Sequence, residues 1–457
     1  MRVFVSGRVS AGIGIVLGSV MLVMLAVPWA REAPASSKAE AVSIPQSSCF
    51  WKGPITTRFS DEGNAAFPDT GAVYWTTTMR MPEGSRIVLH GRFAHARYQS
   101  LNSYRSSDRS PTDALNDIST VPDEGSYNPF KVGARRDTPG RIRKYTVRIL
   151  DQLPPEGPGA KNTLYAGVED QSVQQLIYRV YVPDSFTRKD LTGGVGLPSV
   201  ELILADGTIM KGQSACDEIS ANVEPLTIQK MPQALYETYR HPGGEEPWFP
   251  STNPATWRAF YNVTFSLQCG YGGECDSRPE RTGGQYSNID NAYVSAAGNK
   301  GFPRGPVWVL HGRMPITVRT GPKVKRMPDG QLRYWSLCQN ESMVTTAGAG
   351  CLYDSQVPRG RNRWYTIVSS LPGDRPRNAR RKCGVGWIPW PANGDGVGNL
   401  DDGFLILRNM LPASGFRHAV QNTTVPGDEK QVMGEYLPTG RYTTKSKFEK
   451  KRGCPKA

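Results

Sequence analysis

The sequence lacks a second membrane-length apolar run: beyond the uncharged stretch at residues 9–28, no comparable segment follows. A chain with one such stretch is not a polytopic membrane protein. Histidine is scarce, with five residues, and no CxxC motif occurs, so a zinc site is not expected. The HExxH signature, the P-loop, a dinucleotide GxGxxG between strand and helix, and the GxSxG turn of α/β-hydrolases are also absent. The sequence therefore contains none of these catalytic motifs.

Glycine and proline, by contrast, are plentiful, with 48 Gly and 36 Pro among 457 residues, of which 38% are apolar and 21% charged. This composition excludes a disordered chain and a coiled coil, and it favours many short strands joined by turns. The formal net charge is +14, from 55 Lys and Arg against 41 Asp and Glu. Such an excess of positive charge favours anionic partners.

The N-terminal segment, residues 1–41, has the pattern of an export signal. Arg2 and Arg8 precede or open the apolar stretch, and small residues suited to signal-peptidase cleavage end at Ala35 and at Ala41. The apolar stretch is long for a signal peptide, so a signal peptide and an uncleaved signal anchor both remain open. Either one makes the protein exported: periplasmic, secreted, or anchored to the outer face of the cytoplasmic membrane.

Eight cysteines follow the N-terminal segment, and an even number in an exported chain predicts disulfides. Short spacing favours the pairs Cys269 with Cys275, around a glycine-rich turn, and Cys338 with Cys351. Elimination then leaves Cys49 with Cys216 and Cys383 with Cys454.

The chain contains an internal repeat. The block VLHGR at residues 88–92 returns at residues 309–313, each time after a PxG turn at the same offset. Further blocks return in the same order: Phe67 and Tyr74 as Tyr286 and Tyr293, residues 97–101 as 333–337, 115–122 as 352–358, 141–147 as 361–367, and 176–183 as 405–412. So many collinear matches indicate a duplication.

Each repeated block is short, rich in β-branched and aromatic residues, and bounded by turn residues, as strands are. The sequence therefore predicts a mainly β protein with two tandem β-sandwich or jelly-roll-like domains. We place the first at residues 42–216 and the second, with a basic C-terminal tail, at residues 257–457. The linker at residues 217–256 is expected to contain a short helix at residues 232–240.

The repeat blocks and the stretch DEGSYNPF at residues 123–130 resemble a family of exported bacterial proteins that is itself uncharacterised. The resemblance covers mainly residues 65–210 and extends more weakly over the second repeat. It implies duplicated β-sandwich domains and an exported location, and it implies no reaction.

Polar residues recur within the repeats and could assemble a cluster in each. His90 with Asp117, and His311 with Asp354, are the candidates for a general base, and serines at 100 and 336 could complete triads. Repeated arginines could bind an anion through bidentate contacts. These arginines are Arg97, Arg141, Arg143, Arg333, Arg361 and Arg363. The alternative is that residues repeated in a repeated fold serve the fold.

A glycine-rich loop at residues 393–402 has oxygen-bearing side chains at the spacing of a calcium loop. The candidate ligands are Asn393, Asp395, Asn399 and Asp402. Pro391 stands at the first ligand position of that pattern, and an aspartate replaces the usual final glutamate. The loop therefore predicts either a weak Ca²⁺ site, the one cofactor considered, or a turn with solvated acids.

Basic residues cluster at residues 375–382 and 445–456, and Trp387 and Trp390 could stack on sugar rings. Partners considered are an anionic envelope polymer, a lipid head group or a carbohydrate. No nucleic acid is expected, and membrane contact is expected only through the N-terminal segment. The leading hypothesis is an exported binding protein for an anionic or carbohydrate ligand. An extracytoplasmic hydrolase using a His and Asp cluster, and a structural surface protein, are the alternatives.

Overall fold

The structure is a computed structural model that describes residues 39–41, 44–167, 173–240, 249–270 and 278–454. Residues 1–38 of the predicted export signal and Cys275 lie outside these residues. Among the residues described, no helix is long and apolar enough to cross a membrane.

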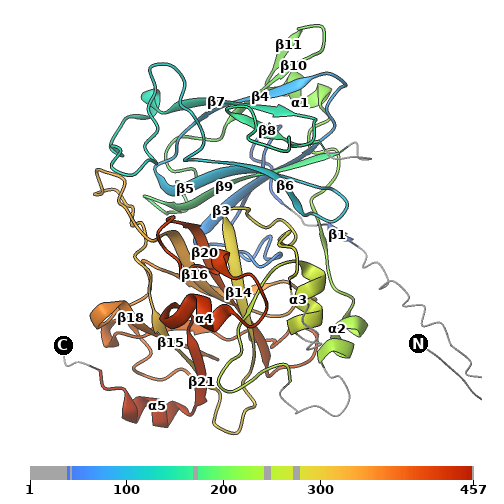
Figure 1. Ribbon diagram of the computed structural model, residues 1–457. Helices are drawn as coiled ribbons and strands as arrows, with labels where there is room; N and C mark the ends of the chain where they lie inside the picture. Colours follow the sequence, from blue (N-terminus) through green and yellow to red (C-terminus); the bar gives the residue numbers. More distant parts are fainter. Residues whose placement is uncertain (1–38, 42–43, 168–172, 241–248, 271–277, 455–457) are drawn as a thin grey trace, which may run out of the picture. The chain divides into compact units, whose positions relative to one another are not determined.

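Four sheets form the bulk of the protein, two in each half of the chain (Figure 1). In the first half, residues 44–229, one sheet has the order β2 (Lys52–Ile55), β3 (Ala72–Met79), β9 (Gln174–Pro183), β5 (Ala96–Tyr104), β6 (Pro111–Asn116). The other has the order β11 (Ile209–Lys211), β10 (Ser199–Ile203), β4 (Arg86–Arg92), β7 (Lys144–Leu150), β8 (Thr163–Tyr165). The short strands β1 (Ala39–Ala41) and β12 (Thr227–Gln229) pair separately.

The second half, residues 249–454, repeats this arrangement. Its first sheet has the order β13 (Arg258–Ala259), β14 (Asn291–Asn299), β20 (Asp402–Pro412), β16 (Leu332–Asn340), β17 (Gly348–Tyr353). Its second has the order β19 (Gly386–Pro389), β18 (Trp364–Ser370), β15 (Val307–Arg313), β21 (Thr439–Thr443). The sheet orders correspond, except that β11 has no counterpart in the second half, and the parallel pair β7 and β8 corresponds to β18 and β19. The prediction of a mainly β fold is confirmed.

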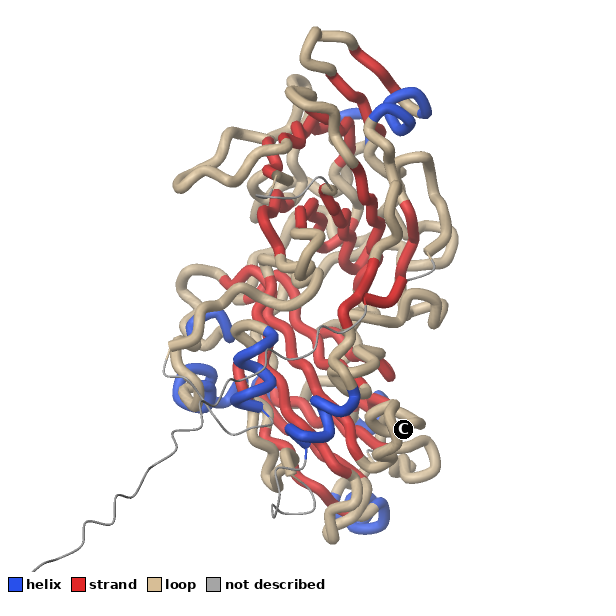
Figure 2. Tube along the Cα trace, turned by 90° about the vertical axis from the view of Figure 1, so that its right-hand side faces the viewer, coloured by secondary structure: helices blue, strands red, loops and turns tan. Residues whose placement is uncertain are grey.

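The helices are short and lie around the strands (Figure 2). They are α1 (Gln213–Glu218), α2 (Gln233–Arg240), α3 (Val263–Gly270), α4 (Glu429–Met433) and α5 (Lys445–Lys451). The 3₁₀ turns are η1 (Gly140–Ile142), η2 (Arg361–Arg363), η3 (Arg381–Cys383), η4 (Val420–Asn422) and η5 (Gly434–Tyr436). Helix α2 falls where the sequence predicts the short linker helix.

Each half has its own apolar core between its two sheets. In the first half, Ile87 and Leu89 of β4 belong to the same buried cluster as Val73 and Trp75 of β3. In the second half, Leu310 and Trp308 belong to the equivalent cluster. Along β4, Ile87, Leu89 and Gly91 are buried, whereas Arg86, His90 and Arg92 on the other face are exposed. This alternation is the period-two pattern that identifies strands.

The repeated His-Gly-Arg block has a packing explanation. Gly91 lies directly opposite Tyr145 on the neighbouring strand, and a Cβ atom at Gly91 would approach the tyrosine ring to 2.3 Å. Gly312 lies opposite Tyr365 in the same way, with the closest approach at 2.8 Å. Because a tyrosine covers each glycine, a side chain cannot be added there without moving the ring.

Three disulfides join described residues. Cys49 pairs with Cys216, Cys338 with Cys351 across β16 and β17, and Cys383 with Cys454. These are three of the four pairings expected from the sequence. Cys269 is also disulfide-bonded, and its expected partner Cys275 lies outside the described residues. Disulfides persist in oxidising compartments, so the protein belongs to an extracytoplasmic environment.

Candidate functional site

The repeated arginines and aspartates form ion pairs between the two halves of the chain. Arg97 of the first half donates from Nη1 to both carboxylate oxygens of Asp354 in the second, at 2.7 and 2.6 Å. The second pair joins the halves in the same way, since Nη1 of Arg333 in the second half donates to Oδ1 of Asp117 in the first half at 3.2 Å. The expected cluster within each repeat therefore does not form, because each arginine pairs with the aspartate of the other half.

These ion pairs are closed off from solvent. The side chains of Arg97 and Asp354 are 0% exposed, and those of Arg333 and Asp117 are 5% and 0% exposed. Burial outweighs the attraction of Arg333 and raises the pKa of Asp117 to about 7. An external anion could reach these guanidinium groups only by displacing the protein's own carboxylates, so the four residues join the two halves.

The remaining candidate arginines lie in different surroundings. Arg143 is buried and donates to the carbonyls of Phe93 at 2.6 Å and Ala94 at 2.7 Å, so backbone oxygens occupy its guanidinium. Arg363 is half-buried and donates to the carbonyl of Met314 at 3.0 Å. Arg141 and Arg361 are exposed in the turns η1 and η2.

The two candidate histidines lie on outer strand faces, away from the candidate aspartates. His90 is next to Thr146 at 3.4 Å and to Glu201 at 3.5 Å. His311 contacts Thr366 at 3.2 Å and stacks on the indole of Trp364, with ring centroids 4.9 Å apart and planes 12° apart.

The hypothetical triads are not assembled. Ser100 donates to Asn102 at 3.0 Å, and Ser336 donates to Asp69 at 2.6 Å. Among the hydrogen bonds of the described residues, neither Asp117 nor Asp354 accepts one from a histidine. The arrangement therefore gives no support to a serine nucleophile activated by His90 or His311.

The predicted calcium loop is held by protein donors. Asp395 is buried, and its Oδ1 accepts from the amides of Val397 and Asn399 at 2.9 and 3.0 Å, while its Oδ2 accepts from the Asn399 side chain at 2.6 Å. Asp402 forms an ion pair with Arg240 and accepts from Asn299 at 2.6 Å. Asn393 is exposed. The acidic side chains of the loop thus form turn and ion-pair contacts with the protein.

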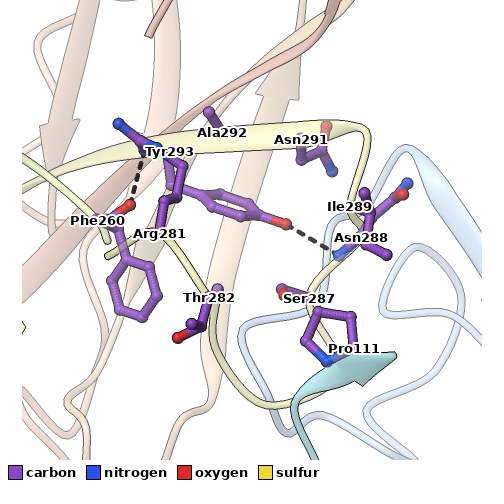
Figure 3. A pocket seen from close by; sticks show the side chains of 11 residues that line it. Pro111, Phe260, Arg281, Thr282, Ser287, Asn288, Ile289, Asn291, Ala292 and Tyr293 are labelled. Carbon is purple, nitrogen blue, oxygen red and sulfur yellow. Dashed lines mark hydrogen bonds between the residues drawn. The ribbon is translucent and has the colours of Figure 1, made fainter. Parts of the chain in front are cut away.

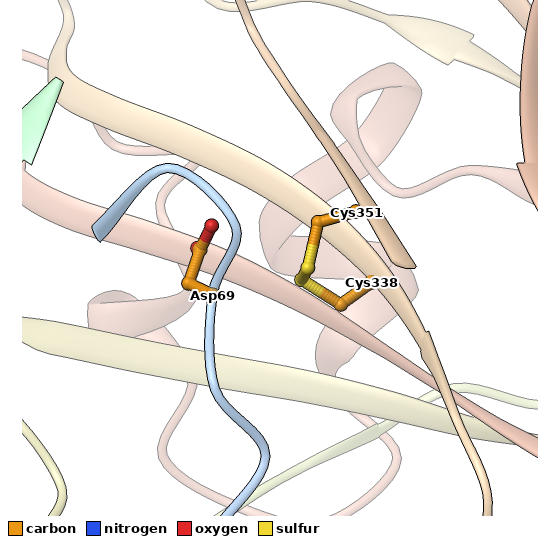
Figure 4. A group of neighbouring side chains, drawn as sticks. All are labelled: Asp69, Cys338 and Cys351. Atoms are coloured by element: carbon orange, nitrogen blue, oxygen red, sulfur yellow. A yellow bond between two sulfur atoms is a disulfide. The ribbon is translucent and has the colours of Figure 1, made fainter. Parts of the chain in front are cut away.

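Asp69, just before β3 in the first half, lies beside the Cys338–Cys351 disulfide that joins β16 and β17 in the second half (Figure 4). Their potential ligand atoms fall within 4.8 Å of one another. The two sulfurs are bonded to each other, however, and the Asp69 carboxylate accepts from the hydroxyls of Tyr334 and Ser336 at 2.8 and 2.6 Å. Since a metal needs free thiolates, this group is a structural contact rather than a metal centre.

The two basic runs predicted from the sequence meet at one surface. The Cys383–Cys454 disulfide links the end of one run to the end of the other. Arg377 pairs with Glu449 of α5 at 3.0 Å, and Lys445 donates to the carbonyl of Gly373 at 3.1 Å. We call the surface formed by residues 375–382 and 445–452 the basic surface. Sequence reasoning found both runs but not their convergence.

The two tryptophans considered for sugar stacking, Trp387 and Trp390, are both at least half-buried. Trp390 is 1% exposed and packs in the core against Trp308. Trp387 is half-buried beneath Arg375, whose guanidinium carbon lies 4.2 Å from the ring centroid. The sequence analysis missed another aromatic side chain, Trp364, whose half-buried ring stacks on His311. Arg452 of the basic surface is close enough to His311 to contribute, after burial, to lowering its pKa.

A separate pocket of about 110 Å³ lies where the turn before β14 meets the start of β6 (Figure 3). It is lined by Pro111, Phe260, Arg281, Thr282, Gly283, Ser287, Asn288, Ile289, Asn291, Ala292 and Tyr293. The Tyr293 hydroxyl accepts from the backbone amide of Asn288 at 3.4 Å. No sequence motif marks this pocket, because its residues come from segments that meet only in the folded chain.

No protein-family model and no curated protein sequence matches the chain. Among solved structures, it is similar to an uncharacterised protein of Burkholderia cenocepacia, with 10% identity, a TM-score of 0.44, and coverage of 85% of this chain and 80% of the other. It is also similar to a Vibrio parahaemolyticus protein, with 12% identity, a TM-score of 0.40, and coverage of 87% and 92%. These two structural neighbours are uncharacterised bacterial proteins.

Proposed function

We propose that the protein is an extracytoplasmic binding protein for an anionic polysaccharide, which it holds at the basic surface. The observation that carries the proposal is the convergence of two basic runs, far apart in the sequence, onto one disulfide-linked surface. A run of charge on its own is often only a solvated face. Two runs that a disulfide and an ion pair hold together present a fixed array of charge.

The charge of this array is strongly unbalanced. Residues 375–382 contribute five basic side chains and no acid, and residues 445–452 contribute five basic side chains and Glu449. Eight of these ten basic residues are exposed: Arg377, Arg380, Arg381, Lys382, Lys447, Lys450, Lys451 and Arg452. Clustered cations of this kind raise the local potential and attract polyanions.

A polysaccharide suits this surface better than a lipid bilayer does. Membrane-binding surfaces usually add apolar side chains that enter the bilayer. None of the large apolar side chains exposed in the described residues belongs to the basic surface. The aromatic pair of Trp364 and His311 lies near Arg452 of the basic surface and offers flat rings against which sugar units can stack.

The test compares two lysine variants of equal net charge. The first replaces Lys382, Lys447, Lys450 and Lys451 by glutamine, since each side chain is exposed and none donates a hydrogen bond to another described residue. The matched control replaces Lys131, Lys144, Lys161 and Lys189, which are also exposed and lie outside the basic surface. The probe is polygalacturonate, with uncharged dextran as the comparison polymer.

We expect the first variant to bind polygalacturonate about tenfold more weakly and the control to bind within about twofold of the unmodified protein. Added salt should weaken binding, because exposed charges are screened. Equal losses in both variants would overturn the proposal, since they would show attraction by net charge alone. Binding to anionic lipid vesicles without binding to polygalacturonate would overturn it in favour of a membrane surface.

We also infer that the two halves of the chain arose by duplication of one β-sandwich domain. The corresponding strand orders of the sheets support this inference. So do the exchanged ion pairs, in which Arg97 and Arg333, and Asp117 and Asp354, occupy matched positions of the repeat.

A further inference from the structure

The disulfide between Cys383 and Cys454 differs in exposure from the two others whose cysteines are both described. Cys454 is exposed, whereas its partner Cys383 is 4% exposed. In the other two disulfides every cysteine is buried or half-buried: Cys49, Cys216, Cys338 and Cys351. Thiol–disulfide exchange begins when a thiolate reaches a sulfur atom, and exposed disulfides are the labile ones. Of these three disulfides, Cys383–Cys454 is therefore the most open to reduction.

The surroundings of this disulfide are strongly basic. Six exposed basic residues lie within four positions of one cysteine or the other: Arg380, Arg381, Lys382, Lys450, Lys451 and Arg452. The thiolate that attacks a disulfide is an anion, and so is the thiolate that it displaces. Nearby positive charge stabilises both anions, so the basic residues favour opening of this disulfide.

Besides the disulfide, two kinds of contact hold the C-terminal run on the protein. Helix α5 has seven residues, and isolated helices shorter than about 12 residues are marginal in water. Its buried side chain, Phe448, packs in an apolar cluster with Val307, Val368, Ala379 and Val385. The polar contacts are concentrated at residues 373–378, where Glu449 accepts from the backbone amide of Arg377 at 2.7 Å. The position of α5 thus depends on what it contacts.

Electrostatic repulsion between the two runs opposes these contacts. Residues 375–382 and 445–452 each carry five basic side chains, and Glu449 is the single acid in the two segments. Because the disulfide and the contacts of Glu449 bring the runs together, their like charges repel each other. The disulfide holds the runs in place against this repulsion by closing a loop whose ends are 71 positions apart.

We propose that the Cys383–Cys454 disulfide is a redox switch that controls the basic surface. When a dithiol reductant opens the disulfide, repulsion separates the two basic runs, and the surface binds its anionic polysaccharide more weakly. This inference rests on the proposed function, because it describes the regulation of the same surface. A bound polysaccharide would in turn neutralise the repulsion and favour the closed form.

The reduction proceeds by two exchanges. A thiolate of the reductant attacks the exposed Cys454 sulfur, breaks the S–S bond and displaces Cys383 as a thiolate, which leaves a mixed disulfide on Cys454. The second thiol of the reductant then attacks this mixed disulfide and releases Cys454. The dithiol is oxidised to its own disulfide, two electrons pass to the protein, and the two protons of the dithiol end on Cys383 and Cys454.

The first measurement identifies the disulfide that opens, and it requires no ligand. The whole exported chain is incubated with increasing dithiothreitol, and free thiols are alkylated and located by peptide mass spectrometry. We expect Cys383 and Cys454 to be alkylated at a dithiothreitol concentration about tenfold below that needed for the other two described disulfides. Opening of Cys49–Cys216 or Cys338–Cys351 at the same or a lower concentration would overturn the proposal.

The second measurement compares polygalacturonate binding by the oxidised protein and by the selectively reduced protein. The reduced protein should bind about tenfold more weakly, and reoxidation should restore the affinity. The double variant Cys383→Ser with Cys454→Ser represents the open form and is the matched control. It should bind as weakly as the reduced protein, and dithiothreitol should not weaken its binding further. If this variant fails to fold, the reduced and reoxidised natural chain still decides.

The switch and the proposed function can fail separately. Equal binding by the oxidised and reduced protein would overturn the switch and leave the proposed function standing. Failure of the oxidised protein to bind polygalacturonate would overturn the proposed function and the switch with it.

Discussion

Replacing Asp354 by alanine should destabilise the protein far more than the loss of a surface charge. The substitution removes both acceptors of Arg97 Nη1, at 2.7 and 2.6 Å, and leaves a guanidinium that is 0% exposed. Its remaining side-chain hydrogen bond is to Ser355 at 2.7 Å, a neutral hydroxyl that cannot balance the charge. Breaking a buried ion pair in this way costs about 3–5 kcal/mol of unfolding free energy.

The measurement is urea-induced unfolding followed by tryptophan fluorescence, with the same buffer for every variant. The matched surface control is Glu224→Ala, which breaks the exposed pair with Arg80, where the side chains are 47% and 42% exposed. That loss should be at most about 1 kcal/mol. A double variant with leucine at Arg97 and Asp354 should lose less than Asp354→Ala, because no unpaired charge remains buried.

The reasoning would be refuted if Asp354→Ala lost no more free energy than Glu224→Ala. It would also be refuted if the double leucine variant were less stable than the single alanine variant, because the cost would then come from lost packing and not from the stranded charge of Arg97.

Three further predictions concern pH, packing and metal. Burial raises the pKa of Asp117 from 3.8 to about 7, so between these pH values the folded state keeps a proton that the unfolded state releases. The free energy of unfolding should therefore fall as the pH rises from about 4 to about 7. The fall should be smaller in Asp117→Asn when urea unfolding is measured across this pH range. Gly91→Ala should lower the free energy of unfolding in urea by about 1–3 kcal/mol, because the added Cβ would lie 2.3 Å from the Tyr145 ring. Gly157→Ala, whose Cβ would have nothing within 4 Å, should change it little, and equal effects would count against the packing argument. A chelator should leave the melting temperature unchanged, while Asp395→Ala should cost about 1–3 kcal/mol, since protein donors hold this carboxylate; a chelator-dependent loss would contradict that assignment.

The strands could be predicted because their signal is local. A strand repeats its environment every two residues, and the blocks that became β4 and β15 carry that alternation in both copies. The Cys338–Cys351 pairing was accessible for a similar reason, since only 13 positions separate the two residues. The recurrence of His-Gly-Arg was also visible, although its cause, a tyrosine on the neighbouring strand over each glycine, was not.

The candidate sites depended on contacts between distant parts of the chain. Arg97 and Asp354 are 257 positions apart, and the repeat pattern matched each with a residue of its own copy rather than with the residue it meets. The pocket at the turn before β14 likewise carries no recognisable motif, because its residues come from segments that meet only in the folded chain.

The sequence by itself thus determined the β class, the repeat, the positions of the strands and the positive charge, because these follow from local periodicity and composition. The tertiary structure alone decided which arginine faces which aspartate, that two basic runs share one surface, and that a pocket lies before β14. The physical reason is that a side chain's partners are set by how sheets pack, and packing brings together residues whose separation along the chain carries no information about their contact.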